Sequence, residues 1–402
     1  MDRKLRKHEQ KGLSLGESTV PPTIKKIVLC GNYGASNLGD EAVLDGILSL
    51  IQKVFPDAEV TVMSADPAET ERLHHVKSVV FIPSGLRSFA ASLHENFGKT
   101  SQAIKKADLF IMGGGGLFSD EKFRALWIWT VQAFFPAFLN KPIVCIGQSV
   151  GPLKTWLGRF FAKRFFRKCK MISVRDSASA KLLKELGFTS VEALADPAFS
   201  LSVQAKDFSE REKFIVLSIR PWLPKELHDQ HEVLAHFIDW VHEKYGFKTK
   251  LVPFQIFQDN DSEELKKILS YLQYPQSAEL TEFSPDYQKT LELISRAQAV
   301  VGMRLHSLIF ATLSETPFLA LSYSQKIDGL INDLDLSDLL LSWKNLQLSE
   351  LQKKFEVLMN QQKTLQEKLH EKKVMSKVLV EKNVELLKSS QEHQKALPAQ
   401  AE

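Results

Sequence analysis

The chain has 402 residues, of which 44% are hydrophobic and 25% are charged, so it can build more than one globular domain with a sizeable core. Its formal net charge of +4 is too small to indicate a nucleic-acid-binding protein. The most apolar stretch, residues 125–139, is shorter than the roughly 20 residues that a membrane-spanning helix needs. Residues 1–23 are polar and basic, without the apolar core of a signal peptide. We therefore expect a cytoplasmic protein that begins with a disordered tail.

The first half of the chain alternates short apolar runs with segments of helical periodicity. The runs that predict strands are residues 26–30, 59–63, 78–82, 108–112, 142–147 and 171–174. Between the first two runs, Val43, Ile47, Ile51 and Val54 recur at helical spacing. Strands that alternate with helices predict βαβ units and a parallel sheet. We assign residues 24–200 to a first Rossmann-like domain.

The charged segment 201–212 interrupts this alternation, and we interpret it as a linker. A second α/β series fills residues 213–344. Its strands are predicted at residues 214–219, 248–252, 278–281, 298–301 and 318–322. Two doubly wound domains joined by a linker enclose a cleft, and ligands of such folds bind outside the carboxyl ends of the strands. The loops at the strand ends are therefore the places where functional residues are expected.

Residues 345–395 predict one long amphipathic helix, followed by a disordered tail at residues 396–402. Two rows of side chains recur every seven residues: Leu348, Phe355, Gln362 and Leu369 in one row, and Leu351, Leu358 and Leu365 in the other. Three arrangements fit this pattern. The helix packs on the body of the protein, forms a coiled coil that makes a homo-oligomer, or stands free.

The sequence GNYGASNLGDEAVLDG, residues 31–46, follows the first predicted strand and has the glycine spacing of a phosphate-binding P-loop. Asp40 and Glu41 replace the lysine and hydroxyl residue that a P-loop requires, so this loop does not bind ATP in that manner. Two interpretations are open. Asp40 caps the following helix while Glu41 lies at its positive end, or a carboxylate faces the cleft and meets the hydroxyls of a polyol.

Other strand ends of the first domain also point to the cleft. The glycine run 113–116, with Gly114 and Gly115, permits close approach of the backbone to a ligand, although a tight turn would also explain it. Gln148 and Arg175 end two further strands. The alternative for Arg175 is an ion pair with Asp176, which itself suits the cap of the helix that follows.

The second domain places a histidine and several cations at its strand ends. Residues 301–307, VGMRLHS, end a strand and open a helix. The backbone amides, the helix dipole and Arg304 predict an anion site there, and His306 is placed for proton transfer. Arg220 ends the strand 214–219 and is either an anion clamp or a partner in a surface ion pair.

Two more charged residues belong to this edge of the second domain. Asp259 follows the strand 248–252 and faces the same region, unless it caps the helix that starts near Asp261. Lys326 follows the strand 318–322, although a free lysine is commonly solvated.

Taken in chain order, these motifs resemble the polysaccharide pyruvyltransferase family, and most closely its bacterial cell-wall branch. The matching stretches are residues 37–42, 113–116, 147–152, 173–177 and 302–307, and the resemblance spans roughly residues 25–335. Each stretch is weak evidence alone, whereas the ordered set is specific. The resemblance implies a GT-B-like α/β fold, in which the first domain holds a sugar acceptor and the second holds phosphoenolpyruvate as the donor. Members of this branch form a pyruvate ketal on a sugar of a lipid-linked precursor.

The resemblance also implies roles for individual residues. The donor-binding residues would be Arg220, Arg304, Leu305 and Lys326. The residues on the acceptor side of the cleft would be Asn37, Asp40, Glu41, Gly114, Gly115, Gln148 and Arg175. We expect His306 to protonate the donor's methylene carbon and Asp259 to act as the base that activates a sugar hydroxyl. This chemistry requires neither a metal nor another cofactor.

The segment 154–170, KTWLGRFFAKRFFRKCK, interleaves seven basic residues with four phenylalanines. It is either an amphipathic helix with its aromatic residues in the core, or a surface that contacts the inner face of the plasma membrane and brings a lipid-linked acceptor near. Two other functions fit the chain less closely. One is a GT-B glycosyltransferase that uses a nucleotide sugar, and the other is a non-catalytic scaffold that binds polysaccharide precursors.

Overall fold

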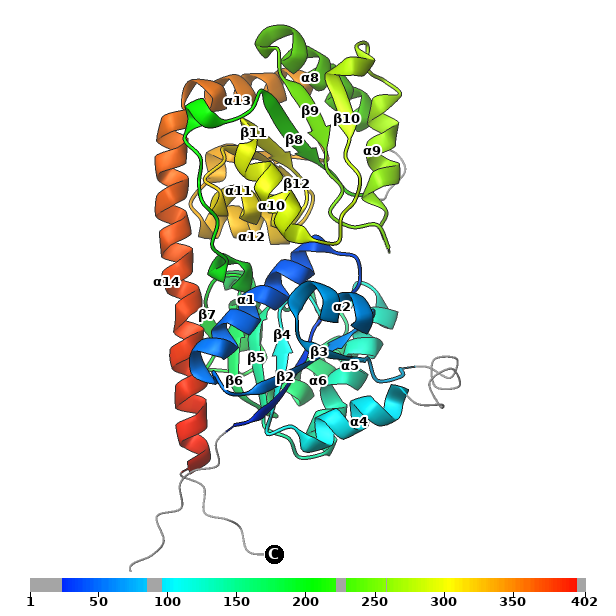
Figure 1. Ribbon diagram of the computed structural model, residues 1–402, viewed down its shortest axis with the longest axis vertical. Helices are drawn as coiled ribbons and strands as arrows, with labels where there is room; N and C mark the ends of the chain where they lie inside the picture. Colours follow the sequence, from blue (N-terminus) through cyan, green and yellow to red (C-terminus); the bar gives the residue numbers. More distant parts are fainter. Residues whose placement is uncertain (1–23, 85–95, 222–228, 258, 396–402) are drawn as a thin grey trace, which may run out of the picture.

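The computed structural model describes residues 24–84, 96–221, 229–257 and 259–395. The tails expected at residues 1–23 and 396–402 lie outside these ranges. Two α/β domains lie end to end, and a long C-terminal helix runs along one side of both (Figure 1). None of the helices in the described ranges is long and apolar enough to cross a membrane.

The N-terminal domain is built on a parallel sheet with the strand order β3-β2-β1-β4-β5-β6-β7. Its strands are β1 (Lys26–Cys30), β2 (Glu59–Ser64), β3 (Lys77–Val80), β4 (Leu109–Gly113), β5 (Ile143–Gln148), β6 (Cys169–Val174) and β7 (Glu192–Ala193). Its helices are α1 (Leu38–Val54), α2 (Pro67–His74), α4 (Asn96–Lys106), α5 (Phe123–Phe138), α6 (Trp156–Phe166) and α7 (Ser177–Glu185), with the short 3-10 helix η1 (Pro197–Ser200) at the end.

The C-terminal domain has a second parallel sheet, ordered β10-β9-β8-β11-β12-β13. Its strands are β8 (Phe214–Ser218), β9 (Lys248–Leu251), β10 (Ala278–Leu280), β11 (Ala299–Gly302), β12 (Phe318–Ser322) and β13 (Leu340–Ser342). Its helices are α8 (Asp229–Tyr245), α9 (Asp261–Leu269), α10 (Tyr287–Arg296), α11 (Leu305–Leu313) and α12 (Gln325–Asp333), with the 3-10 helices η3 (Pro275–Ser277) and η4 (Ser337–Leu339).

Each sheet of the molecule is covered on both faces, which explains why its strands read as unbroken apolar runs. In β1, for example, Ile27 and Leu29 belong to one hydrophobic core, whereas Val28 and Cys30 belong to the core on the opposite face. Both faces are therefore dry, and polar side chains are confined to the strand ends.

Both sheets reverse their winding direction once, and these reversals position the site. In the N-terminal domain β1 is followed outward by β2 and β3, and the chain then returns to place β4 on the other side of β1. In the C-terminal domain β11 returns in the same way to the other side of β8. Loops diverge outside the carboxyl ends of the strands at such points and leave a crevice. The two crevices face each other across the domain boundary.

The C-terminal segment is two helices rather than the single helix predicted for residues 345–395. Helix α13 (Leu348–Asn360) buries Leu351, Phe355 and Leu358 in the core it shares with α8, and the chain turns at Gln361 before α14 (Gln362–Lys395) begins. The heptad rows continue across this turn, so the spacing of leucines does not reveal it.

Helix α14 packs on the body of its own chain, which answers the question that the heptad pattern left open. It contacts α1, η1 and β6 in the N-terminal domain and α11 in the C-terminal domain (Figure 1). Its buried Leu369, Val380 and Leu387 join the main core, and Asn383 Oδ1 accepts a 2.6 Å hydrogen bond from Ser173 Oγ of β6. The helix therefore bridges the two domains.

The interdomain segment 201–212, predicted as a charged linker, is partly structured and bonded to the C-terminal domain. It contains a short 3-10 helix, η2 (Phe208–Glu210), and ends in the buried Arg211. The Arg211 guanidinium donates to the carbonyls of Ala297 and Glu315, at 3.0 and 2.9 Å. Burial lowers the pKa of Arg211 to about 10. These bonds anchor the segment to the C-terminal domain before β8 begins.

Candidate active site in the interdomain cleft

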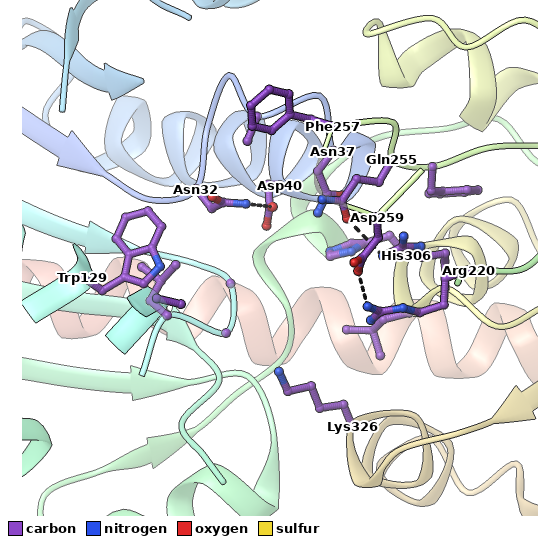
Figure 2. Close-up of a pocket in the computed structure, with 18 of the residues that line it drawn as sticks. Asn32, Asn37, Asp40, Trp129, Arg220, Gln255, Phe257, Asp259, His306 and Lys326 are labelled. Atoms are coloured by element: carbon purple, nitrogen blue, oxygen red, sulfur yellow. Dashed lines mark hydrogen bonds and ion pairs between the residues drawn. The ribbon is translucent and has the colours of Figure 1, made fainter. Parts of the chain in front are cut away.

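A cavity of about 460 Å³ lies between the two domains, and we call it the cleft cavity. Side chains from strand-end loops of both domains line it (Figure 2). From the N-terminal domain these include Asn32, Asn37, Asp40, Gly115, Gly116, Trp129 and Arg175, and from the C-terminal domain Arg220, Gln255, Phe257, Asp259, Arg304, Leu305, His306, Tyr323 and Lys326.

One wall of the cleft cavity is fixed by a direct backbone contact between the domains. Leu38 N donates a 3.0 Å hydrogen bond to the carbonyl of Phe254, and Asn37 and Gln255 form an antiparallel bridge. Asn37 is also the N-cap of α1, since its side chain accepts from Gly39 N at 3.1 Å. Helix α1 therefore begins three residues earlier than the sequence suggested, and Asp40 is not its cap.

Asp40 lies in the first turn of α1 and faces the cleft cavity. It is buried, and Asn32 Nδ2 donates to its Oδ2 at 2.7 Å (Figure 2). Burial raises the pKa of Asp40 above its ordinary value, against the hydrogen bond from Asn32, which lowers it. A carboxylate with a raised pKa beside a cavity is a stronger base than one in water.

Glu41 does not line the cleft cavity, contrary to the prediction. Its Oε1 accepts from Gly34 N at 2.8 Å, and its Oε2 lies 2.9 Å from Nε2 of the buried His74. The other ring nitrogen of His74 lies 2.5 Å from Asp45, which accepts a 2.6 Å hydrogen bond from Tyr287 of α10. Although burial lowers it, the pKa of His74 rises to about 9 because two carboxylates bind the ring. Glu41 thus stabilises the loop 31–37 through its hydrogen bond with Gly34.

The glycines that follow β4 have two roles: one packs against α1, and others line the cavity. Gly114 (φ 62°) packs against Val43, because a Cβ there would lie 2.0 Å from Val43 Cγ1, so its role is structural. Gly115 lines the cavity together with Gly116, whereas Gly114, which the resemblance also placed on the acceptor side, does not. Gln148 is fully buried and is not among the lining residues; both polar atoms of its amide lack a partner in the part of the chain that the structure describes.

Arg175 reaches the cleft cavity, but its partner is Asp196 and not the neighbouring Asp176. Arg175 Nη1 lies 2.7 Å from Asp196 Oδ2, and both side chains are almost fully buried. Asp176 instead caps α7, where its Oδ1 accepts from Ser179 N at 2.7 Å. Burial would raise the pKa of Asp196, but the Arg175 guanidinium and the His306 ring outweigh it and hold the pKa well below its ordinary value. Asp196 lies buried behind Arg175 and His306 and is not itself a lining residue.

His306 crosses the domain boundary. It belongs to α11 of the C-terminal domain, yet its Nε2 lies 3.6 Å from Oδ2 of Asp196 in the N-terminal domain. Its ring rests directly on Gly39 of α1, since a Cβ on that glycine would lie 2.0 Å from Nδ1. Nε2 has no hydrogen-bond partner among the described residues. The ring is therefore held from two sides, with Gly39 against Nδ1 and Asp196 near Nε2.

Arg220 and Asp259 meet beside His306 (Figure 2). Arg220 Nη2 forms an ion pair with Asp259 Oδ2, and Nη1 donates to Tyr323 Oη at 2.8 Å. The guanidinium also lies over the Tyr323 ring, 5.1 Å from its centroid. Asn260, rather than Asp259, caps α9. Asp259 is therefore neither a helix cap nor a free carboxylate.

Arg304 is tied down more firmly than the predicted anion clamp. Its Nε donates to Asp261 Oδ2 at 3.0 Å, and Nη2 bonds the other carboxylate oxygen, so the pair is bidentate. Nη1 donates to Gln255 Oε1 at 3.1 Å. Asp261 also accepts backbone bonds from Phe254 N and Gln255 N, at 3.0 and 3.1 Å. This network shapes the loop 254–261, with Arg304 as its hub.

Lys326 is the cavity-lining cation that lacks an ion pair within the described residues. The three lining arginines each have a carboxylate: Asp196 for Arg175, Asp259 for Arg220 and Asp261 for Arg304. The Lys326 ammonium lies beside Gly116, where a Cβ would come within 2.7 Å of Nζ. Burial and the charge of Arg175 lower the pKa of Lys326. An anion that entered the cavity would relieve this repulsion.

A larger cavity of about 710 Å³, the side cavity, adjoins the cleft cavity and shares Arg220, Tyr323 and Lys326 with it. Its N-terminal wall is the loop 149–154 together with Arg159, and its C-terminal wall is the start of α12. The first turns of α11 and α12 have no side-chain cap, and each helix opens toward one of the two cavities. Uncapped helix starts attract anions.

Sequence reasoning missed two kinds of site residue. The carboxylates Asp196 and Asp261 carry no motif beyond an ordinary helix start. The apolar wall of the cleft cavity, formed by Phe81, Leu117, Ile128 and Trp129, lies on segments that read only as core. No group of three or more potential ligands that could hold a metal ion occurs in the described ranges.

Comparison with known proteins assigns the chain to a family. The sequence model of the polysaccharide pyruvyl transferase family matches residues 37–325, which include most residues of the cleft cavity but not Asn32 or Lys326. The amylovoran biosynthesis protein AmsJ of Erwinia amylovora is 21% identical over 364 residues, covering 78% of this chain and 87% of AmsJ.

Solved structures confirm the GT-B fold. Anabaena Alr3699/HepE in complex with UDP and glucose aligns with a TM-score of 0.59 at 14% identity, over 93% of this chain and 100% of that chain. S. aureus MnaA in complex with UDP aligns with a TM-score of 0.60 at 12% identity, over 94% of this chain and 100% of that chain. At such low identity these similarities concern the fold alone.

Proposed function

Because the chain belongs to the polysaccharide pyruvyl transferase family, we propose that it transfers the pyruvyl group of phosphoenolpyruvate to a sugar of a cell-surface polysaccharide precursor, with release of phosphate and formation of a cyclic ketal. The observation that carries this proposal is the position of His306. Its imidazole lines a cavity that also contains Lys326, a cation without an ion pair among the described residues, and the buried carboxylate of Asp40. A proton donor, an anion-binding site and a base would thus lie in one cavity.

The donor would bind where the two cavities join. Phosphoenolpyruvate carries a carboxylate and a phosphate, and both are bound well by guanidinium forks and ammonium groups. Lys326 lacks a counter-ion among the described residues, and Arg220 would exchange its single bond to Asp259 for the donor. The uncapped start of α11 adds backbone N–H groups. Arg304, with both carboxylate oxygens of Asp261 bound, would shape this subsite rather than grip the donor.

His306 would supply the proton that makes the donor reactive. Protonation of the methylene carbon leaves C2 electron-poor, and a sugar hydroxyl then forms the first C–O bond to C2. Asp196 lies 3.6 Å from Nε2 and stabilises the protonated ring. The phosphate leaves as the bond between C2 and its bridging oxygen breaks, and a second hydroxyl closes the ketal. Of the two hydroxyl protons released, one replaces that of His306 and the other is available to the phosphate.

We assign the base that accepts the first hydroxyl proton to Asp40 in preference to Asp259. Asp259 is the partner of Arg220 on the donor side of the cleft, where it holds that arginine until the donor binds. Asp40 is buried, its pKa is raised, and it lies on the acceptor domain next to Gly39, on which His306 rests. The base for attack on C2 and the acid for protonation of the adjacent methylene carbon would then be neighbouring side chains.

The acceptor sugar would lie against the apolar wall that contains Trp129, because aromatic faces suit the C–H face of a sugar ring. Phe257 at the mouth of the cleft cavity is 75% exposed, which leaves its ring free to cover a ligand. The side cavity offers room for the remainder of a lipid-linked oligosaccharide, with Lys154 and Arg159 at its wall. The reaction would take place on the cytoplasmic side of the membrane.

The test is a comparison of ligands followed by one substitution. Phosphoenolpyruvate should raise the melting temperature, whereas UDP and UDP-sugars should not, and turnover with an acceptor should release inorganic phosphate. His306→Ala should lower turnover by roughly 10²- to 10⁴-fold while the donor still binds. Stabilisation by UDP-sugars alone, or release of a nucleoside diphosphate, would instead favour a glycosyltransferase.

A further inference from the structure

We propose that the outer faces of α5 and α6 form a docking surface for an anionic lipid bilayer. This surface, called the docking face below, consists of Phe123, Trp127 and Phe138 of α5 and Trp156 and Phe160 of α6, with the basic residues of α6 around them. The five aromatic side chains are between 45% and 82% exposed. The inference is independent of the reaction that the cleft carries out.

Only part of the aromatic content of α6 belongs to the core. Phe165 and Phe166 are fully buried and pack around Phe118, as an ordinary amphipathic helix requires. Trp156 and Phe160 are 78% and 54% exposed. Burying a large aromatic side chain is worth roughly 1.5–3 kcal/mol, so two such residues left in water call for a partner.

The exposed side chains follow helical spacing and therefore lie in stripes. One side of α6 carries five exposed side chains at spacings of three or four residues. They are Trp156, Phe160, Lys163, Arg164 and, at the C-cap, Arg167. Gly158, Ala162, Phe165 and Phe166 occupy the opposite side and are buried. On α5, Phe123 and Trp127 are four residues apart, and Phe138 is exposed at the far end.

The two stripes are adjacent because one carboxylate connects the starts of the helices. Asp120, three residues before α5, accepts hydrogen bonds from Lys154 N at 2.9 Å and Thr155 N at 2.6 Å, just before α6. The helices also pack against each other. They cover the face of the N-terminal sheet opposite α1 and α14, so the docking face lies away from the interdomain bridge (Figure 1).

Charge favours an anionic partner. Residues 154–170 contain seven basic residues and no acidic one. The exposed Lys163, Arg164, Arg167 and Lys168 form no ion pair with any described residue. Cations of this kind attract anionic headgroups, while Trp and Phe enter the boundary between headgroups and acyl chains. A single-stranded nucleic acid fits less well, since its bases stack inside a basic groove and these aromatic residues stand on the outer sides of two helices.

The position of the docking face suits an enzyme with a membrane-bound substrate. Lys154 and Arg159, which line the side cavity, lie on the same short stretch as Trp156 and Phe160. A bilayer bound to the docking face would thus lie beside the entrance to the side cavity. The binding itself needs neither donor nor acceptor, so it can be measured without catalysis.

The experiment is co-sedimentation of the full chain with liposomes, without donor or sugar. One set contains phosphatidylcholine with ~30 mol% phosphatidylglycerol, and the other contains phosphatidylcholine alone. We expect binding to the anionic set that weakens with salt. Trp156→Ala/Phe160→Ala and Lys163→Ala/Arg164→Ala/Arg167→Ala should each lower the partition coefficient, the latter on the order of 100-fold.

A matched control removes the same number of charges elsewhere. Lys289, Lys353 and Lys363 are exposed and have no ion pair with a described residue, so Lys289→Ala/Lys353→Ala/Lys363→Ala should bind liposomes like the wild type. All variants should retain the wild-type melting temperature. Equal loss in the control triple variant, or no binding to anionic liposomes, would overturn the proposal. Tight binding of a single-stranded oligonucleotide with no liposome binding would overturn it in favour of a nucleic acid.

Discussion

Gly39 offers a sharp test of the way His306 is held. We predict that Gly39→Ala will lower turnover by about 10²-fold or more while donor affinity changes little. The glycine lies in the first turn of α1, where alanine is intrinsically favoured over glycine by roughly 0.5–1 kcal/mol. Any loss must therefore come from the contact with His306 and not from the helix.

The magnitude follows from the contact distances. A Cβ on Gly39 would lie 2.0 Å from His306 Nδ1, whereas ordinary van der Waals contact begins at 3.4 Å, so the ring must withdraw by the difference, roughly 1.4 Å. A displacement of about 1 Å in a reacting group can cost about 10²-fold in rate. The ring would also move relative to Asp196, which now lies 3.6 Å from Nε2.

The assay is phosphate release at saturating donor, made as a double-mutant cycle. Gly39→Ala acts through His306 if it has no further effect in a His306→Ala background. Gly98→Ala is the control, because a Cβ there meets no atom within 4 Å, and it should keep full activity. If Gly39→Ala keeps wild-type turnover, or if it causes an equal loss in both backgrounds, the contact between Gly39 and His306 is not the source of the effect.

Three other substitutions test the remaining groups. Lys326→Met should weaken phosphoenolpyruvate binding by roughly 10- to 100-fold in calorimetry, since a charge-assisted bond is lost; unchanged affinity would place the donor elsewhere. Asp196→Asn should lower kcat more than it raises KM and should shift the alkaline limb of the pH–rate profile to lower pH, because the protonated ring of His306 loses its counter-charge; an unshifted profile would limit Asp196 to packing. His74 has a folded pKa of about 9, above its unfolded value of 6.5, so its stabilisation is complete below pH 6.5 and lost as pH rises through 9, by up to about 3 kcal/mol in urea unfolding. His74→Gln should flatten this slope, and identical slopes would contradict the assignment.

Much of the architecture was predictable because both sheets are buried on two faces. Apolar runs located the long strands, and the parallel arrangement then required their carboxyl ends to share an edge. That is why Arg220, His306 and Lys326 converge as expected. The strands β7 and β13 at the edges of the sheets were not predicted; they contain only two and three residues.

The pairing of charges was not predictable from the sequence. Arg175 has Asp176 beside it in the chain but binds Asp196, 21 residues away. Arg304 binds Asp261, 43 residues away. These choices depend on how loops from separate βα units are brought together, and the contact of His306 with Asp196 depends in addition on how the two domains dock. Local spacing carries no information on either arrangement.

Helix α14 has a consequence for the order in which the molecule matures during synthesis. It is the last described element to leave the ribosome, and it is the one that bonds Ser173 of β6 through Asn383 and Glu315 of the other domain through Lys373, at 2.6 and 2.9 Å. Both lobes can collapse around their own sheets and form the direct contact between Leu38 and Phe254 while translation continues, so α14 adds the last bridge between them. A nascent chain stalled before residue 362 would lack this bridge and would depend on the direct contacts between the domains alone.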